Sequence, residues 1–385
     1  MKDRAGIYIK NLHGYSSFTP KKLPPEPPLE IDSEMQDVLS SADRNLGRLD
    51  GIAETLPNPE LFVAMYVKKE ALLSSQIEGT QASLVDVLDI ENSDKPNLRK
   101  NVDEVVNYVA AMKHGLARLN DFPLSLRLIR EIHDILLKDV RGSEKSPGEF
   151  RTSQNWIGPQ GCDLFNATFV PPTVDEMTLA LRDLELFMHD NENRIPALIK
   201  IAFIHAQFET IHPFLDGNGR VGRLLITFWL CQQNILTQPL LYLSYFFKKN
   251  RAEYYDRLMD IRKKGAWEEW VKFFLSGISE VSEESIKTVK QIIKLKENFR
   301  GRLYNAEVHN KSYQLLDSLF STPIINREQI ISLFKISSPT AGTLIDRFCE
   351  LQILKDMTPD RSRNKKYVFS DYLTILERGT ENLVE

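Results

Sequence analysis

The sequence predicts a mainly α protein: a helical core, a β-hairpin flap in the middle of the chain and a small C-terminal α+β domain. Helical spacing of apolar residues dominates from Ile31 onward. A segment rich in Gly, Pro and Asn interrupts it at 141–172, with short β-prone runs around 152–158 and 167–170. Beyond about residue 305, three short helical patterns precede two strand-like runs around a polar turn.

Composition places the chain among ordinary globular proteins. With 385 residues, two or three domains are expected, and 42% hydrophobic content is enough for a sizeable core. The net charge of −4 excludes an overall basic field that would attract nucleic acid or a membrane surface. No apolar run approaches the roughly 20 residues of a membrane span. The first 18 residues carry no apolar core of a secretion signal. The three cysteines (Cys162, Cys231 and Cys349) are odd in number and far apart, which favours a reduced, cytoplasmic location.

The pattern divides the chain into four regions. Five prolines within residues 20–28 predict an extended N-terminal arm. Helices are expected at 58–79, 101–119, 125–140, 174–191, 195–211 and about 220–234. A long charged helix is expected at about 281–302 and is interpreted as a solvated linker. The predicted regions are an arm and helical segment (1–100), a core (101–280), a linker helix (281–304) and a C-terminal module (305–385).

The stretch HPFLDGNGRVGR, residues 212–223, concentrates polar chemistry between two apolar segments. Pro213 disfavours helix at His212, so the preceding helix should end there with its imidazole facing the loop. Gly217 and Gly219 allow consecutive N–H groups to converge on an anion. The next helix, expected from about Arg220, adds the positive end of its dipole at the same place.

The remaining groups of this stretch suit a polyphosphate. Arg220 and Arg223 are three residues apart on one helical face, and forked guanidinium groups bind phosphate well. Asp216 offers a lone carboxylate for Mg²⁺ beside phosphates, and His212 offers a base for an incoming hydroxyl. The bland alternative is a polar loop with His212 as a satisfied core histidine. No Gly-Lys-Ser/Thr follows, so this is not a Walker A loop, and His205 with His212 lacks further zinc ligands.

HPFLDGNGRVGR resembles the motif of the Fic family, HPF-x-D/E-GN-G/K-R-x-x-R, at every specified position. PGEFRTSQNWIG resembles the family's flap, and YLSYFFKKNRAEYYDRL the segment after its motif, so the resemblance covers about residues 35–280. Family members mostly transfer AMP from ATP to a Ser, Thr or Tyr hydroxyl of a protein. The resemblance therefore implies a Fic-type helical core, ATP as substrate, Mg²⁺, a target protein and self-modification as further outcome.

The resemblance also implies roles for individual residues. His212 would deprotonate the target hydroxyl, and Asp216 would hold Mg²⁺ against the α- and β-phosphates. Nucleotide contacts would come from the residues that follow: Gly217, Asn218, Gly219, Arg220, Val221, Gly222 and Arg223, with Tyr254 and Tyr255 near the adenine. Ile157 and Gly158 would line a target peptide that pairs with the flap. Core packing for the tyrosines and an ordinary turn for the flap pair are the alternatives.

A second stretch, ALLSSQIEGT, ends the helix expected at 58–79. Ser74 and Glu78 are four residues apart on one face, and Gly79 follows. By itself Glu78 would be a solvated carboxylate near a helix end. The string resembles the family's inhibitory motif, S/T-x-x-x-E-G/N, which implies that Glu78 pairs with Arg223 and takes the place of the γ-phosphate. This resemblance implies an intramolecular brake.

The C-terminal pattern of three helices and a hairpin is that of a winged helix. Its expected recognition helix carries one arginine, Arg347, whereas the turn PDRSRNKK is basic. Docking to protein, or to the rest of this chain, is favoured over DNA binding. Three alternatives to AMP transfer stay open: removal of AMP, transfer of another phosphate-containing group, and a DNA-binding regulator whose Fic part senses ATP. Dimers are frequent in the family, and no feature of the sequence decides the oligomeric state.

Overall fold

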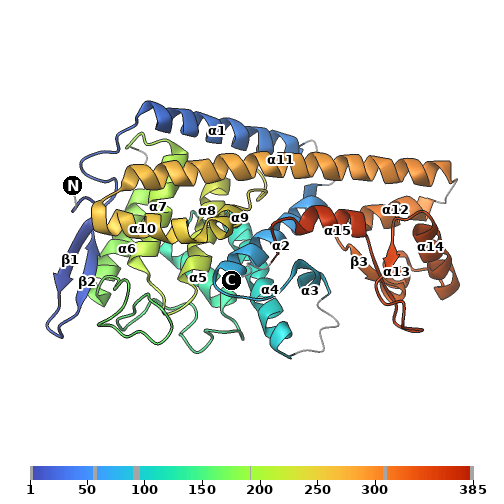
Figure 1. The fold of residues 1–385 in the computed structure, drawn as a ribbon, viewed down its shortest axis with the longest axis horizontal. Helices are drawn as coiled ribbons and strands as arrows, with labels where there is room; N and C mark the ends of the chain where they lie inside the picture. Colours follow the sequence, from blue (N-terminus) through green and yellow to red (C-terminus); the bar gives the residue numbers. More distant parts are fainter. Residues whose placement is uncertain (1–2, 55–58, 90–95, 191, 307–309, 382–385) are drawn as a thin grey trace.

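The computed structural model describes residues 3–54, 59–89, 96–190, 192–306 and 310–381, and within these ranges the prediction of a mainly helical protein is confirmed. Eleven helices precede residue 306 (Figure 1). They are α1 (Ser33–Glu54), α2 (Pro59–Ile77), α3 (Leu84–Leu88), α4 (Pro96–Arg118), α5 (Leu126–Leu136), α6 (Val174–His189), α7 (Ala197–Ile211), α8 (Asn218–Gln232), α9 (Ser244–Lys249), α10 (Arg251–Lys264) and α11 (Trp267–Asn305). Among the described helices, none combines the length and apolar content needed to cross a lipid bilayer.

Helices α7 and α8 form the centre of the core. Every residue of α7 from Leu198 to Ile211 is buried, and α8 is buried from Arg220 to Leu230. A helix that is apolar on all sides needs neighbours on all sides. Here α4, α5, α6, α10 and α11 contact one or both of them. The short loop that joins α7 to α8 is thereby held between rigid elements.

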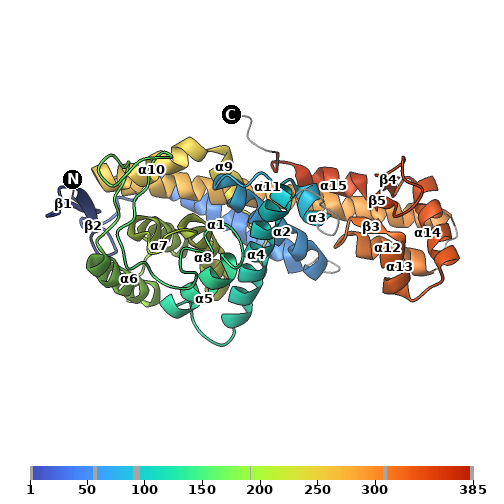
Figure 2. The same ribbon diagram turned by 90° about the horizontal axis from the view of Figure 1, so that it is seen from below.

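The longest element, α11, corrects one expectation. It runs without a break for 39 residues, through the predicted boundary at residue 280, and joins the core to the C-terminal module (Figures 1 and 2). The predicted linker is not solvated on every side, because apolar residues at helical spacing bury one face. They include Val281, Ile286, Val289, Ile292, Phe299 and Leu303. The segment contains no proline, and so nothing in it interrupts the helix.

The N-terminal arm is a hairpin rather than a plain extended segment. Strand β1 (Gly6–Lys10) pairs antiparallel with β2 (Ser16–Pro20). Phe18 is fully buried, and its amide donates to Val170 O at 2.9 Å, so β2 lies against the flap. The prolines within residues 20–28 predicted only an extended arm, and this pairing was not predicted.

The flap, residues 141–172, contains less β structure than the sequence predicts. Its described backbone forms a single antiparallel bridge, in which Ile157 and Phe169 exchange N–H···O bonds of 2.8 and 3.0 Å. The prolines at 159, 171 and 172 remove the amide donors that a longer ladder would need. The flap is instead pinned by the side chains of Arg151 and Asn155, as described below.

The C-terminal module has the order of elements that the sequence predicts, with a third strand and a final helix added. Helices α12 (Asn310–Leu319), α13 (Arg327–Phe334) and α14 (Ser338–Glu350) precede strands β4 (Lys355–Asp356) and β5 (Lys366–Val368). Strand β3 (Ile324–Asn326) also joins β5, which gives the antiparallel order β3-β5-β4. Helix α15 (Ser370–Glu377) then returns along α11 toward α2 (Figures 1 and 2). The winged-helix designation stays a prediction.

Candidate active site

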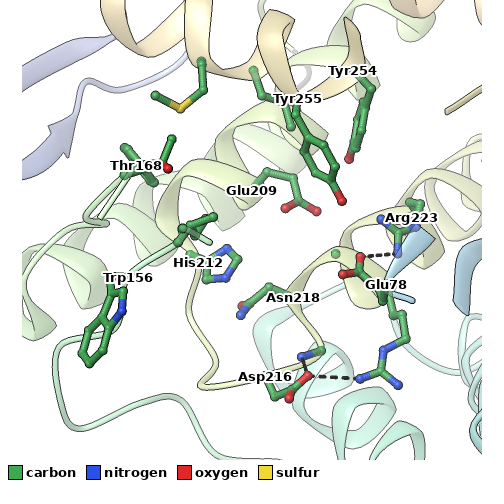
Figure 3. Close-up of a pocket in the computed structure, with 18 of the residues that line it drawn as sticks. Glu78, Trp156, Thr168, Glu209, His212, Asp216, Asn218, Arg223, Tyr254 and Tyr255 are labelled. Atoms are coloured by element: carbon green, nitrogen blue, oxygen red, sulfur yellow. Dashed lines mark hydrogen bonds and ion pairs between the residues drawn. The ribbon is translucent and has the colours of Figure 1, made fainter. Parts of the chain in front are cut away.

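A cavity of about 690 Å³ brings most of the predicted site residues together (Figure 3). Its floor is the α7–α8 loop with the first turn of α8, and its walls come from the flap, from α10 and from the end of α2. Glu78 therefore reaches a cavity whose other residues lie far from it in the sequence. Figure 3 shows His212, Asn218 and Asp216 on one side and Arg223 with Glu78 on the other.

His212 ends α7 in a left-handed conformation, with φ of 49° and ψ of 60°. Its amide still donates to Phe208 O at 3.0 Å, and its carbonyl accepts from Arg151 Nε and Asn155 Nδ2, both at 3.1 Å. These contacts from the flap fix the backbone that carries the imidazole. Burial, followed by the nearby Arg262 and Arg151 guanidinium groups, lowers the pKa of His212 to about 3. The ring is therefore neutral at pH 7 and able to accept a proton.

The helix expected from about Arg220 begins two residues earlier, at Asn218. Gly217 is the N-cap with φ of 77°, and Val221 makes the first helical hydrogen bond, to Gly217 O at 3.0 Å. The amides of Asn218, Gly219 and Arg220 precede that bond and point out of the helix end. The side chain of Asn218 does not face the anion position. It closes the loop instead, accepting from Phe214 N and donating to Phe214 O, both at 2.8 Å.

Asp216 lines the cavity with a side chain that is 34% exposed. Its Oδ1 accepts from Gly217 N at 2.6 Å and from Arg220 Nη2 at 3.1 Å, which orients the carboxylate. His133 of α5 also forms a hydrogen bond with this loop. Its Nδ1 accepts from Gly148 N at 2.9 Å, so Nε2 carries the proton and donates to Asp216 O at 3.1 Å. The His133 ring also stacks on Phe214 at 3.7 Å.

Arg220 is 1% exposed and lies between two carboxylates. Asp216 is on one side, and Glu104 Oε2 of α4 lies 3.6 Å from Arg220 Nη1 on the other. Its Nε and Nη1 make no hydrogen bond to the described residues. A buried guanidinium with unused donors at the edge of a cavity suits an anionic ligand. Glu104 in turn accepts from Thr80 Oγ1 at 2.8 Å, directly after the Glu78–Gly79 turn.

Glu78 and Arg223 form the pair that the inhibitory resemblance implies. Arg223 Nη2 donates to Glu78 Oε1 at 2.7 Å and to Ser74 O at 3.0 Å, while Arg223 Nε donates to Ser74 Oγ at 2.8 Å. Burial alone would raise the pKa of the Glu78 carboxyl, but Arg223, Arg220 and His212 outweigh it and hold that pKa below its ordinary value. Gly79 ends the turn with φ of 93°, a conformation that favours glycine.

The other predicted residues differ in their placement. Tyr254 and Tyr255 both line the cavity. Tyr255 is 38% exposed, whereas Tyr254 is 1% exposed and donates its hydroxyl to His205 Nε2 at 2.9 Å. That bond, with His205 Nδ1 donating to Gly222 O at 2.9 Å, makes His205 a satisfied core histidine. Ile157 and Gly158 lie on the cavity wall, and their contact with a target peptide stays a prediction.

Two residues assigned to nucleotide contact lie elsewhere. Val221 and Gly222 do not line the cavity: Val221 is buried in the core, and a Cβ at Gly222 would lie 2.3 Å from Glu209 Oε1. Their helical positions turn them away from the loop, toward α7. The resemblance implied nucleotide contacts for every residue from 217 to 223. Successive residues of a helix point in different directions, so only some of them reach the cavity.

Sequence reasoning missed the residues that position this loop: Glu104, His133, Arg151, Asn155, Glu209 and Arg262. They are polar residues in otherwise apolar helical patterns or in the flap. For Glu104 and His133, the apolar helical pattern around them indicates a buried position. A single sequence does not show which residues such a buried polar side chain contacts.

Glu209, three residues before His212, gives a prediction on stability. Its carboxyl lies between His212 and the two tyrosines in Figure 3, is 7% exposed in the residue as a whole, and leaves Oε1 without a partner among the described residues. Burial is the main cause that raises its pKa from 4.5 to about 7. The folded protein thus holds this proton more tightly than the unfolded chain, and the stability from this difference is lost as pH rises from 4.5 through about 7.

A Glu209→Gln protein should therefore gain stability relative to the parent as pH rises. The gain at pH 8 should exceed that at pH 4.5 by at most about 3 kcal/mol. Urea unfolding of both proteins at the two pH values measures it. A difference that is the same at both pH values would contradict the assignment.

The fold and the cavity define a class of protein before any comparison is made. It is a helical protein in which a helix N-terminus and two buried arginines form an anion site, a neutral histidine faces that site, and an internal carboxylate already pairs with one arginine.

Comparison with known families gives the name of that class. Residues 36–117 match the Fic/DOC family N-terminal model, and residues 123–230 match the Fic/DOC family model. Through residues 36–230 the chain belongs to the Fic/DOC family.

Curated relatives and solved structures agree with this. The chain is 31% identical to "Protein adenylyltransferase Fic" of Aedes aegypti over 204 residues, 51% of this chain and 37% of that protein. It is 28% identical to a "Probable protein adenylyltransferase" of Aquifex aeolicus (strain VF5) over 203 residues, 52% of this chain and 57% of that protein. The chain thus spans only part of each relative.

The fold of a Fic family protein from Desulfovibrio desulfuricans G20 covers 89% of this chain and 98% of its own, with a TM-score of 0.59 and 19% identity. At that identity the likeness concerns the fold alone.

Proposed function

We propose that this protein is an autoinhibited protein adenylyltransferase, which transfers AMP from ATP to a Ser, Thr or Tyr hydroxyl of a target protein and of itself. The two named relatives are adenylyltransferases by name. The observation that carries the proposal is the cavity itself, in which His212 and the α8 amides face a position bounded by Arg220 and Arg223.

The chemistry assigned to these residues is proton removal and charge stabilisation. Neutral His212 accepts the proton of the target hydroxyl, and the hydroxyl oxygen forms a bond to the α-phosphorus of ATP. The bond from that phosphorus to the bridging oxygen breaks, and pyrophosphate leaves. The amides of Asn218, Gly219 and Arg220, with the guanidinium groups of Arg220 and Arg223, stabilise the negative charge that develops on the phosphates.

The donor set at Asp216 fits one Mg²⁺ shared with phosphates. No group of three His, Cys, Asp or Glu residues suited to a metal occurs among the described residues, so an ion here would need oxygen ligands from the nucleotide and water. Asp216 Oδ1 is engaged by Gly217 and Arg220, so Oδ2 is the carboxylate oxygen that would serve as the protein ligand. When bound, Mg²⁺ would supply charge neutralisation on the phosphates.

An Asp216→Asn protein is expected to need more Mg²⁺ for AMP transfer. Loss of the carboxylate charge should reduce the rate at a fixed Mg²⁺ concentration by about 10- to 100-fold, with partial recovery as Mg²⁺ is raised. A titration of AMP transfer against Mg²⁺ measures this. A half-saturating Mg²⁺ concentration equal to that of the parent would exclude Asp216 as the ligand.

The inhibition follows from competition at Arg223. A γ-phosphate seated on this guanidinium would meet the Glu78 carboxylate, which holds Arg223 Nη2 at 2.7 Å. ATP then binds only in a pose that leaves its α-phosphorus out of line with His212.

Intact mass spectrometry tests the function directly. A Glu78→Gly protein incubated with ATP and Mg²⁺ should gain the mass of one or more AMP groups, and labelled ATP should mark a target protein in a lysate. A gain equal to phosphate, or loss of AMP from a modified protein, would identify a different reaction. No gain on any protein would refute the proposal.

A further inference from the structure

Three side chains on α2 and α9 bind the backbone of the segment that follows α15. Lys69 Nζ donates to Arg378 O at 2.8 Å, Gln76 Nε2 donates to Thr380 O at 3.0 Å, and Lys248 Nζ donates to Glu381 O at 2.5 Å. We call these three residues the donor row. Lys69 and Lys248 are each 4% exposed and Gln76 is 9% exposed, so these residues are largely buried with the segment in place.

The donor row binds the main chain of this segment rather than its side chains. All three of its bonds to the segment go to the main-chain carbonyls of residues 378, 380 and 381, a group that any residue supplies. Among these residues Thr380 is buried, at 5% exposed, while the side chain of Arg378 reaches outward to Glu284 at 3.2 Å. The segment forms a turn, in which Gly379 has φ of 81° and Thr380 N donates to Glu377 O at 2.8 Å. The surface therefore suits a peptide that makes the same turn, with a small residue at the position of Thr380.

One member of the donor row is also part of the inhibitory turn. Gln76 Nε2 donates to Ala82 O at 2.9 Å as well, and Gln76 O accepts from Gly79 N at 3.0 Å. Gln76 Oε1 accepts from Lys248 Nζ at 2.7 Å. The side-chain amide of Gln76 thus joins the C-terminal segment to Ala82, and the main-chain carbonyl of the same residue holds Gly79, directly after Glu78.

A second contact joins the C-terminal module to the helical core. Lys366 of β5 forms an ion pair of 2.5 Å with Asp89, directly after α3. Helix α15 and the Lys366–Asp89 ion pair thus position residues 378–381 against the donor row, and no second protein is needed to keep them there.

We propose that the donor row is a peptide-binding surface whose occupant in this structure is residues 378–381, and that this occupancy holds Glu78 on Arg223. A partner protein that offers a segment able to make the same turn, with free carbonyls, would compete for the row, displace the C-terminal segment and loosen the turn that carries Glu78. The activity readout of this inference rests on the proposed function, but its structural readout does not.

The first experiment measures the turn directly. In a protein that lacks residues 378–385, hydrogen exchange at the amides of Glu78, Gly79 and Thr80, which now donate to Ser75 O and Gln76 O, should accelerate by about tenfold. A synthetic peptide of residues 376–385 added to the shortened protein should restore slow exchange, and the same peptide carrying Thr380→Trp, which is too large for that buried position, should not.

A matched pair of substitutions tests the row without shortening the chain. Lys248→Met removes one donor to the segment, whereas Lys249→Met removes its exposed neighbour, which pairs with Glu280. AMP transfer should rise by about tenfold in Lys248→Met and stay at the parental level in Lys249→Met. In a Glu78→Gly background, Lys248→Met should add nothing, because the brake that it releases is already absent.

Unchanged exchange in the shortened protein, or equal rates in Lys248→Met and Lys249→Met, would overturn the inference. If the Glu78→Gly protein transfers no AMP at all, the proposed function fails, and the exchange experiment still decides whether the C-terminal segment holds the turn.

Discussion

Replacing Glu78 by glycine is expected to raise AMP transfer by up to about 100-fold, if the closed state holds about 99% of the molecules. The reason is local. Glu78 Oε1 lies 2.7 Å from Arg223 Nη2, and the carboxylate stands where an outer phosphate would need the same guanidinium. Initial rates of self-modification and target modification at saturating ATP measure the increase.

Two further variants distinguish loss of the Glu78–Arg223 contact from a general destabilisation of α2. Glu78→Gln keeps the size of the side chain and removes its charge, so its rate should fall between those of the parent and Glu78→Gly. Ser74→Ala removes one bond to Arg223 Nε and should have a smaller effect than either. Equal rates for the parent and Glu78→Gly would refute the brake and leave the transfer chemistry untouched.

Replacing His212 by alanine should lower AMP transfer by at least about 10²-fold, because the step then lacks its base. The substitution is best made in the Glu78→Gly protein, where the starting rate is high. Nucleotide affinity should change little, since the arginines and amides that bind phosphate remain. The measurement is the transfer rate together with ATP binding by calorimetry.

His189→Ala, at the exposed end of α6, is the control for loss of a histidine elsewhere. Parental transfer by the His212→Ala variant, with ATP still bound, would remove His212 from its assigned role.

The sequence predicted some parts of this molecule and not others, and the difference has physical reasons. Helices α5, α7 and α8 follow from the periodicity of apolar residues and, for the end of α7, from the proline after His212, both of which act within a few residues. The grouping of His212, Asp216, Arg220 and Arg223 also follows, because one loop and one helical turn carry all four.

The contacts across the fold were beyond single-sequence reasoning. Glu104 meets Arg220 from a helix more than one hundred residues upstream in the chain, and Arg151 and Asn155 clamp His212 from the flap. Ser74 and Glu78 were found only because their string resembles a known motif. Their pairing with Arg223 depends on how α2 packs beside α8, and spacing along the chain does not encode that packing.

The uninterrupted course of α11 has a consequence for how this architecture tolerates insertions. A helix turns by about 100° and rises by about 1.5 Å for each added residue. One extra residue after Val281 would rotate the whole C-terminal module around the axis and carry Glu381 away from Lys248. Seven extra residues would nearly restore the angle but displace the module by about 10 Å. The number of residues in α11 therefore determines whether the C-terminal segment can reach Lys248 beside the cavity.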